Sequence, residues 1–95
     1  MALFDLLGRP WSMGVVWRLH DGPLTFRALQ SACGDMSPSL LSRRLKELTA
    51  TDLVVHDGTG YRLTVHGHEL FTLLEPLGNW AAHWAEHGEF DMPDE

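Results

Sequence analysis

The sequence is short of cysteine and of long apolar runs, and each shortage excludes a class of protein. The single cysteine, Cys33, cannot form an internal disulfide or supply a cysteine-based zinc site. No apolar run approaches the ~20 residues of a membrane span, and the N-terminus lacks the basic and apolar regions of a secretory signal. We therefore expect a soluble, cytoplasmic protein that has no membrane partner.

Positive charge is also scarce. Lys and Arg number 7 against 13 Asp and Glu, so the formal net charge is −6. This balance argues against a non-specific polyanion binder, although it is compatible with a local basic face, because the position of charges matters more than their sum. Five acids fall in the last ten residues: Glu86, Glu89, Asp91, Asp94 and Glu95. We predict one domain over residues 1–88 and an acidic, flexible tail over 89–95.

Apolar spacing predicts three helices in the first half of the chain. They cover residues 11–20, residues 26–33, and a segment from Ser37 to about Thr51, where a capping serine precedes a proline. Asp21-Gly22-Pro23 and Gly34-Asp35 separate these helices. The dipeptide Leu24-Thr25 is a candidate for a short strand.

After the third of these helices the apolar residues no longer follow helical spacing and instead follow that of a strand. Residues 53–57 and 61–63 have strand character and flank Gly58-Thr59-Gly60, so we predict a hairpin. Thr64 is the expected cap of the next helix, whose apolar face carries Leu70, Leu73 and Leu74. Pro76 is expected to interrupt that helix or to start another one, and Leu77, Trp80 and Trp84 continue the apolar stripe.

Two short helices followed by a hairpin predict a winged helix-turn-helix. The fold class is therefore mainly α with a small β-hairpin, and the N- and C-terminal helices are expected to form a dimer seam. The apolar residues at the two ends exceed what a core of this size can cover, which indicates an interface. The predicted interface residues are Leu3, Phe4, Leu7, Leu77, Trp80 and Trp84.

The capped helix from Ser37 is the candidate recognition helix, and its wheel has two faces. Leu41, Leu45 and Leu48 lie on one side, whereas serines and cations lie on the other, where they suit base edges and phosphates. We place Arg44 on the flank, where its guanidinium meets a carboxylate or a phosphate. The predicted DNA-contacting residues are Ser37, Ser39, Ser42, Arg43, Arg44, Lys46 and Arg62. The alternative is that this helix is only solvated and that the chain is a winged-helix protein-interaction module without DNA binding.

Spaced motifs over residues 6–87 resemble the HxlR-type winged helix-turn-helix regulators, which are related to the MarR group. The resemblance rests on Gly8, Trp11-Ser12, the stretch from Asp21 to Leu29, the stretch from Met36 to Leu48, the stretch from Tyr61 to Leu70, and Trp80. It implies a homodimeric bacterial transcription factor whose recognition helices enter the major groove of double-stranded DNA. It also implies that the first and last helices make the dimer contacts.

Three departures from the family pattern stand out. The N-terminal cysteine that some members use for sensing is absent, the wing is short, and Thr25 stands where the family has an arginine before Phe26. The short wing leaves its contact with DNA open.

Other motifs have weaker functional interpretations. His83-Trp84-Ala85-Glu86-His87 spells an inverted zinc-peptidase motif, but such a site needs a third ligand and a cleft, and solvated histidines are the favoured interpretation. Cys33 is expected to be a packed small hydrophobe rather than a sensor thiol. We therefore predict no enzyme activity, no metal and no cofactor. A small-molecule effector, held in an aromatic pocket beside the last helix, stays open.

Overall fold

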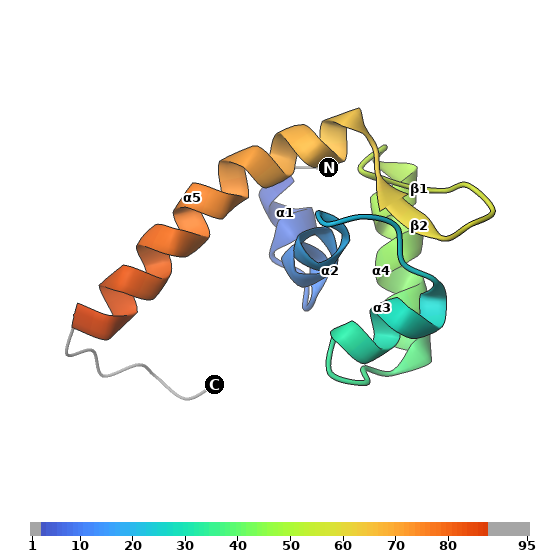
Figure 1. The fold of residues 1–95 in the computed structure, drawn as a ribbon, viewed down its shortest axis with the longest axis horizontal. Helices are drawn as coiled ribbons and strands as arrows, with labels where there is room; N and C mark the ends of the chain where they lie inside the picture. The colour runs from blue at the N-terminus through green and yellow to red at the C-terminus, as the bar shows by residue number, and fades with distance from the viewer. Residues whose placement is uncertain (1–2, 88–95) are drawn as a thin grey trace.

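The computed structural model describes residues 3–87 and contains five helices and one hairpin in that range. Figure 1 shows α1, α2, α3, α4 and the hairpin grouped together, while the far end of α5 extends away from them. The elements are α1 (Leu3–Leu7), α2 (Ser12–Leu19), α3 (Phe26–Ala32), α4 (Pro38–Ala50), β1 (Val54–His56), β2 (Tyr61–Leu63) and α5 (Val65–His87). The acidic tail predicted over 89–95 lies outside the described residues. No helix in the described range is both long and apolar enough to cross a membrane.

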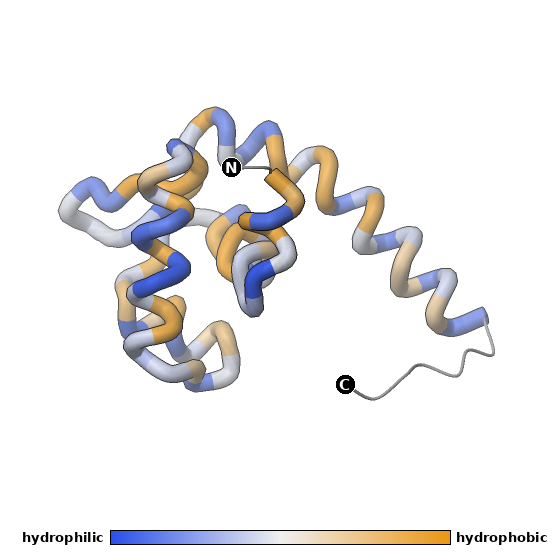
Figure 2. Tube along the Cα trace, turned by 180° about the vertical axis from the view of Figure 1, so that it is seen from behind, coloured by the Kyte–Doolittle hydropathy of each residue, from blue (hydrophilic) through white to orange (hydrophobic). Residues whose placement is uncertain are grey.

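The core forms around α2, where Figure 2 shows hydrophobic segments gathered. Val15, Val16 and Leu19 are at most 1% exposed, and the buried leucines of α4 belong to the same cluster. Full burial of one such side chain contributes about 1.5–3 kcal/mol, so these contacts dominate the stability of a chain this small. Cys33 is buried in this cluster, which confirms its prediction as a packed small hydrophobe.

The turn between α3 and α4 sets the direction of α4 relative to α3. Gly34 and Asp35 both have positive φ, of 70° and 56°, which ends α3 and redirects the chain. The side chain of Gln30 donates to the carbonyl of Met36 at 2.9 Å and closes the loop. Thr25 caps the start of α3, since its hydroxyl accepts from the Ala28 amide at 3.1 Å.

The hairpin has the predicted position, and its register pairs Val54 with Leu63 and His56 with Tyr61. The expected strand at Leu24-Thr25 is reduced to one isolated bridge between Leu24 and Tyr61. This bridge attaches the segment before α3 to the hairpin, so the wing is held to the helix-turn-helix by backbone hydrogen bonds as well as by packing.

Helix α5 begins at the predicted cap, because the Gly67 amide donates to the Thr64 hydroxyl at 3.0 Å. The expected break at Pro76 is wrong: α5 is one helix over Val65–His87 with Pro76 inside it. The proline lies at an exposed position, where water can satisfy the carbonyl that loses its amide partner. The prediction that Leu73 lies on the apolar face of α5 is also wrong, since Leu73 is 71% exposed while Leu70 and Leu74 are buried.

Gly67 marks the closest approach between α5 and the segment before the hairpin. A Cβ at this position would lie 2.1 Å from the carbonyl oxygen of Leu53, which itself accepts from the Thr64 amide. The nearest atoms are the Leu53 carbonyl and the Leu63 Cβ, and neither is the far end of a flexible side chain that can move aside. A glycine is therefore required here by space and not by backbone conformation.

We predict that Gly67→Ala destabilises the protein by about 2 kcal/mol or more, although alanine is the better helix former by about 1 kcal/mol. Thermal or urea unfolding followed by circular dichroism measures the change. The neighbouring exposed residue supplies the control, because His68→Ala changes the same turn without entering the contact. Equal stability of Gly67→Ala and His68→Ala would show that the close approach is absent.

Candidate nucleic-acid interface

Helix α4 separates a buried face from an exposed one, as its sequence predicts. Leu41, Leu45 and Leu48 are at most 2% exposed and pack into the core. On the other side Ser39, Arg43 and Lys46 are exposed, and Ser42 is half-buried. We call these four the outer face of α4. Within residues 3–87, neither Arg43 nor Lys46 has an ion pair or a hydrogen bond to another side chain, so both cations are available to a partner.

The start of α4 places two hydroxyl groups beside its first turn. The Ser37 hydroxyl accepts from the Leu40 amide at 3.3 Å, and Pro38 occupies the first helical position. The hydroxyls of Ser37 and Ser39 lie 3.0 Å apart. The predicted cap is confirmed, and a helix start that carries hydroxyls on a thirteen-residue helix suits a phosphate oxygen.

Arg44 is the residue of α4 whose predicted role the structure corrects. Its side chain is 8% exposed, so it lies with the leucines and not on the outer face. Its Nε donates to the Pro10 carbonyl at 2.7 Å, and a terminal nitrogen donates to Glu47 at 2.9 Å. Arg9 pairs with the other oxygen of Glu47. The expected carboxylate partner is present, and burial removes Arg44 from the set of residues that can meet DNA.

Arg62 also has an internal partner, at the tip of the hairpin. Its Nε donates to Asp57 at 2.7 Å, and the Thr59 hydroxyl and amide donate to the same carboxylate. The Thr59 hydrogen bond, then the Arg62 hydrogen bond, lowers the pKa of Asp57 well below its usual range. Because successive strand residues point to opposite faces, Arg62 lies on the side of β2 away from Tyr61 and Leu63.

A small hollow between α4 and the hairpin continues the outer face. It has a volume of about 230 Å³ and brings Ser42 and Lys46 together with residues that were not among the predicted DNA contacts. These are Thr49, His56 and Tyr61, and the rings of the last two lie 4.5 Å apart. The signal for Thr49 was its spacing of three residues from Lys46 on the same helical face.

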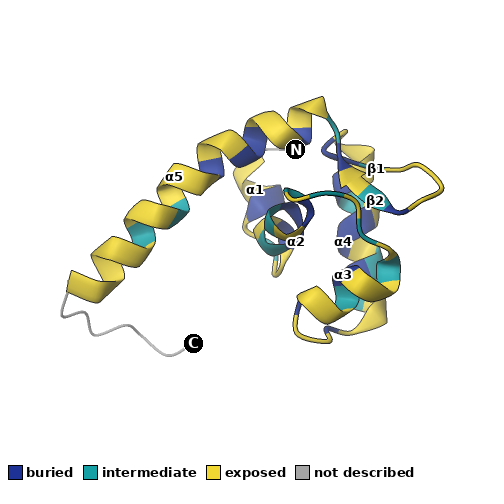
Figure 3. Ribbon diagram, viewed as in Figure 1, coloured by how far each residue is buried: buried dark blue, intermediate teal, exposed yellow. Residues whose placement is uncertain are grey.

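The predicted interface residues separate into an exposed group and one exception. Leu3, Phe4, Leu77, Trp80 and Trp84 are 41–83% exposed, and the last two stack with ring centroids 5.8 Å apart. Figure 3 shows the second half of α5 as mostly exposed. Leu7 is the exception, since it is 6% exposed and packs in the core of its own chain, because α1 turns that side chain inwards.

The histidines of the inverted zinc-peptidase motif do not assemble a metal site in the described part of the chain. Residues 3–87 contain no group of three or more His, Cys, Asp or Glu side chains placed to hold a metal ion. The Nδ1 of His87 lies 3.0 Å from the His83 carbonyl, which occupies one ring nitrogen locally.

Residues 6–89 match the family model described as HxlR-like helix-turn-helix. An uncharacterized HTH-type transcriptional regulator of Methanocaldococcus jannaschii is 31% identical over 91 residues, covering 90% of this chain and 85% of that protein. The HTH-type transcriptional regulator YodB of Bacillus subtilis is 29% identical over 95 residues, covering 93% and 85%.

Solved structures are similar over the same region. The quinone-bound YodB from B. subtilis is 31% identical and aligns with a TM-score of 0.78 over 84% of this chain and 91% of that one. A possible HxlR family transcriptional factor from Thermoplasma volcanium is 27% identical and aligns with a TM-score of 0.83 over 92% and 84%. A regulator of the MarR family from Enterococcus faecalis, 22% identical with a TM-score of 0.76, shares the fold.

Proposed function

The chain belongs to the HxlR-like helix-turn-helix family of transcriptional regulators, and from this premise we propose how it binds DNA. It acts as a homodimer that recognises a specific operator, and α4 of each protomer enters a major groove. It works as a cytoplasmic regulator and not as an enzyme. The observation that carries the proposal is the outer face of α4, where two unpaired cations and two serines face away from the core.

The chemistry of this face suits the edge of a base pair. An arginine can donate two parallel hydrogen bonds to the O6 and N7 of guanine, and a lysine can approach the same atoms. We assign the base-edge contact to Arg43 and a base or phosphate contact to Lys46, with Ser39 and Ser42 beside them. Ser37, at the start of α4, contributes through a phosphate, since amide groups and the helix dipole favour an anion there.

Two residues that were predicted to contact DNA have a reduced role or none in this proposal. Arg44 is left out of the proposed set because its guanidinium is buried against Pro10 and Glu47. Arg62 remains a proposed peripheral phosphate contact of the wing, weakened because Asp57 already neutralises part of its charge.

We predict that Arg43→Ala weakens operator binding by about 1–3 kcal/mol, because a bidentate contact to a base is lost. Fluorescence anisotropy with labelled DNA from upstream of the protein's own coding region measures the affinity. An unrelated duplex of equal length is the matched control, since loss of a base contact lowers operator affinity alone, whereas loss of a phosphate contact lowers both.

The thermal unfolding midpoint of Arg43→Ala should equal that of the unsubstituted protein, because the side chain is exposed and makes no contact with another described side chain. Unchanged operator affinity in this variant would remove Arg43 from the interface. If the unsubstituted protein binds no duplex at all, the result would favour the protein-interaction module instead.

The dimer is proposed from the uncovered apolar residues at the two ends of the described chain. Phe4 is 83% exposed, and Leu77 and Trp80 are more than half exposed. Large exposed apolar side chains in this number indicate an interface, and a symmetric pair of chains would cover the same residues on each. A two-fold axis would also set the two α4 helices about one DNA turn, ~34 Å, apart.

We predict a mass of about twice the 10.7 kDa of one chain in light scattering at tens of micromolar protein. Trp80→Glu should shift the protein towards the monomer, because a charge would be buried in the seam. Asn79→Glu is the matched control, since it adds the same charge at the adjacent exposed position outside the predicted set. A monomeric unsubstituted protein would contradict the proposed dimer and, with it, the proposed pair of α4 helices one DNA turn apart.

A further inference from the structure

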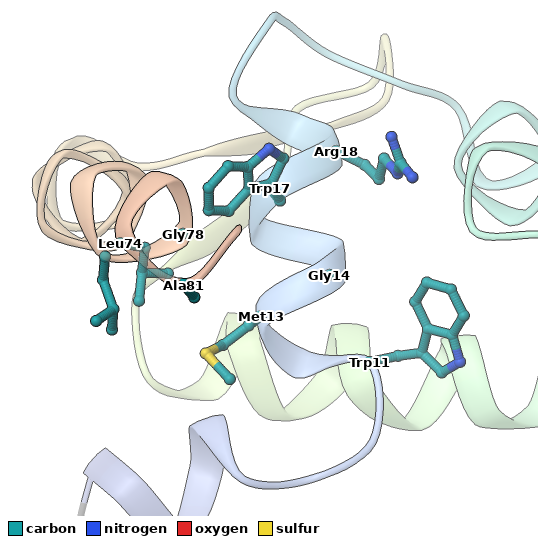
Figure 4. A pocket seen from close by; sticks show the side chains of 9 residues that line it. Trp11, Met13, Gly14, Trp17, Arg18, Leu74, Gly78 and Ala81 are labelled. Carbon is teal, nitrogen blue, oxygen red and sulfur yellow. The ribbon is translucent and has the colours of Figure 1, made fainter. Parts of the chain in front are cut away.

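Two hollows in the described part of the chain differ in the chemistry of their walls. The larger has a volume of about 450 Å³ and mainly apolar walls, and Figure 4 shows Met13 and Trp17 extending into it from α2 towards α5. The smaller, between α4 and the hairpin, has a volume of about 230 Å³, which is below the range of sites for drug-sized ligands and suits a small polar group. We call it the α4–hairpin hollow, and it is lined by Ser42, Leu45, Lys46, Thr49, His56 and Tyr61.

The residues that line the α4–hairpin hollow include no acid, although acids outnumber bases in this chain by 13 to 7. Lys46 supplies an ammonium group, His56 supplies an imidazole, and three hydroxyl-bearing side chains complete the polar lining. Within residues 3–87, the side chains of Lys46, Thr49 and His56 make no hydrogen bond or ion pair with another residue. A lining of free donors without a carboxylate fits an anion.

The carboxylate that follows His56 in the chain does not compete for this lining. Asp57 accepts hydrogen bonds from Arg62 and from Thr59 at the tip of the hairpin, and it does not line the hollow. The titratable groups that share the hollow with His56 are the Tyr61 phenol from β2 and the ammonium group from α4. An anion that enters the hollow therefore meets cations and hydroxyls and no negative side chain.

The hairpin wall of the hollow is held in place by backbone hydrogen bonds. Leu24 and Tyr61 exchange two of them, at 3.0 and 2.8 Å. Gly60 permits this approach, because a Cβ there would lie 2.7 Å from the Leu24 carbonyl oxygen. The Tyr61 ring then supports the His56 imidazole, with ring centroids 4.5 Å apart. A wall that is already ordered loses little conformational freedom when a ligand binds.

We propose that the α4–hairpin hollow seats one phosphate group of the DNA backbone between Lys46 and a protonated His56; this contact rests on the proposed function. Lys46 also belongs to the outer face of α4, so a helix that presents this face to a major groove brings the hollow to the flanking backbone. The hairpin then meets DNA mainly through its His56 side, because Arg62 on the opposite side is paired with Asp57. Such a contact carries no sequence information, but it fixes the position of α4 on the duplex.

The first test replaces single phosphates of the labelled upstream duplex with uncharged methylphosphonates and measures affinity by fluorescence anisotropy. We expect one replacement in each half-site to weaken binding of the unsubstituted protein by about fivefold. His56→Gln should reduce this loss and the double variant with Lys46→Gln should abolish it, because the changes remove the same contact. His68→Gln is the matched control, since it alters another exposed histidine that does not line the hollow, and it should show the full loss.

Proton uptake gives a readout that a merely structural role of His56 would not move. Because an anion favours the charged imidazole, DNA affinity should be highest at low pH and fall as the pH rises through the range in which histidine loses its charge. Between about pH 6 and pH 8 we expect the fall to be about fivefold larger in the unsubstituted protein than in His56→Gln. His68→Gln should behave like the unsubstituted protein. Both side chains are exposed, so neither variant should change the thermal unfolding midpoint.

Inorganic phosphate distinguishes a phosphate of DNA from a free anion. In NMR titrations of the DNA-free protein at about pH 6, inorganic phosphate should shift the His56 ring signals only at millimolar concentrations or above, because a free anion lacks the other contacts of the interface. Binding at micromolar phosphate would assign the hollow to a free phosphorylated ligand and overturn the proposal.

Two further results would overturn the phosphate contact. They are a methylphosphonate scan in which no replacement couples to His56, and a pH dependence that His56→Gln leaves unaltered. Either result, obtained with a protein that binds the upstream duplex, contradicts the contact in the hollow and leaves the proposed function standing. Failure of the unsubstituted protein to bind any duplex at either pH would contradict the proposed function, and the contact with it.

Discussion

The buried guanidinium of Arg44 is the constraint on which the arrangement of the helices depends. A charge removed from water is costly unless hydrogen bonds and an opposite charge replace the lost hydration. The Pro10 carbonyl and the Glu47 carboxylate do so, and Arg9 shares the same carboxylate. Because Pro10 and Arg9 precede α2 while Arg44 and Glu47 belong to α4, this network fixes α4 against the start of α2.

The fixed rotation of α4 decides which side chains face outwards. With Arg44 held inwards together with the leucines, the outer face retains the neighbouring cation, Arg43, and the cation three residues further on, Lys46. Two adjacent arginines therefore differ: Arg44 ties α4 to the start of α2, and Arg43 is the proposed contact for DNA.

The sequence predicted the elements whose signals are local. Ser37 and Thr64 were identified as caps, the hairpin followed from Gly58-Thr59-Gly60, and the two faces of α4 followed from its wheel, because each depends on neighbours along the chain. The family was likewise predicted from motifs and is confirmed. Interface and DNA-contact residues stay predictions, apart from those that burial removes.

Errors arose where distant contacts decide the outcome. The helical wheel placed Arg44 beside the buried side of α4 and predicted its carboxylate partner, but not its hydrogen bond to the Pro10 carbonyl, which depends on how α2 and α4 meet. Leu7 is buried because α1 packs into the core, which no local pattern encodes. Helix α5 continues through Pro76 because that position is exposed, although the residue type alone predicts an interruption. The close contact between Gly78 and the Trp17 indole becomes apparent only when α2 and α5 are placed together.

The salt dependence of operator binding tests the central claim most directly, because phosphate contacts release counterions in proportion to their number. Lys46, Arg62 and one further exposed cation per protomer, such as Arg27, would give a dimer about four to six phosphate contacts. We expect the slope of log affinity against log salt concentration to lie between about −3.5 and −5.5. A slope near zero would contradict the account, because α4 would then meet a partner other than DNA.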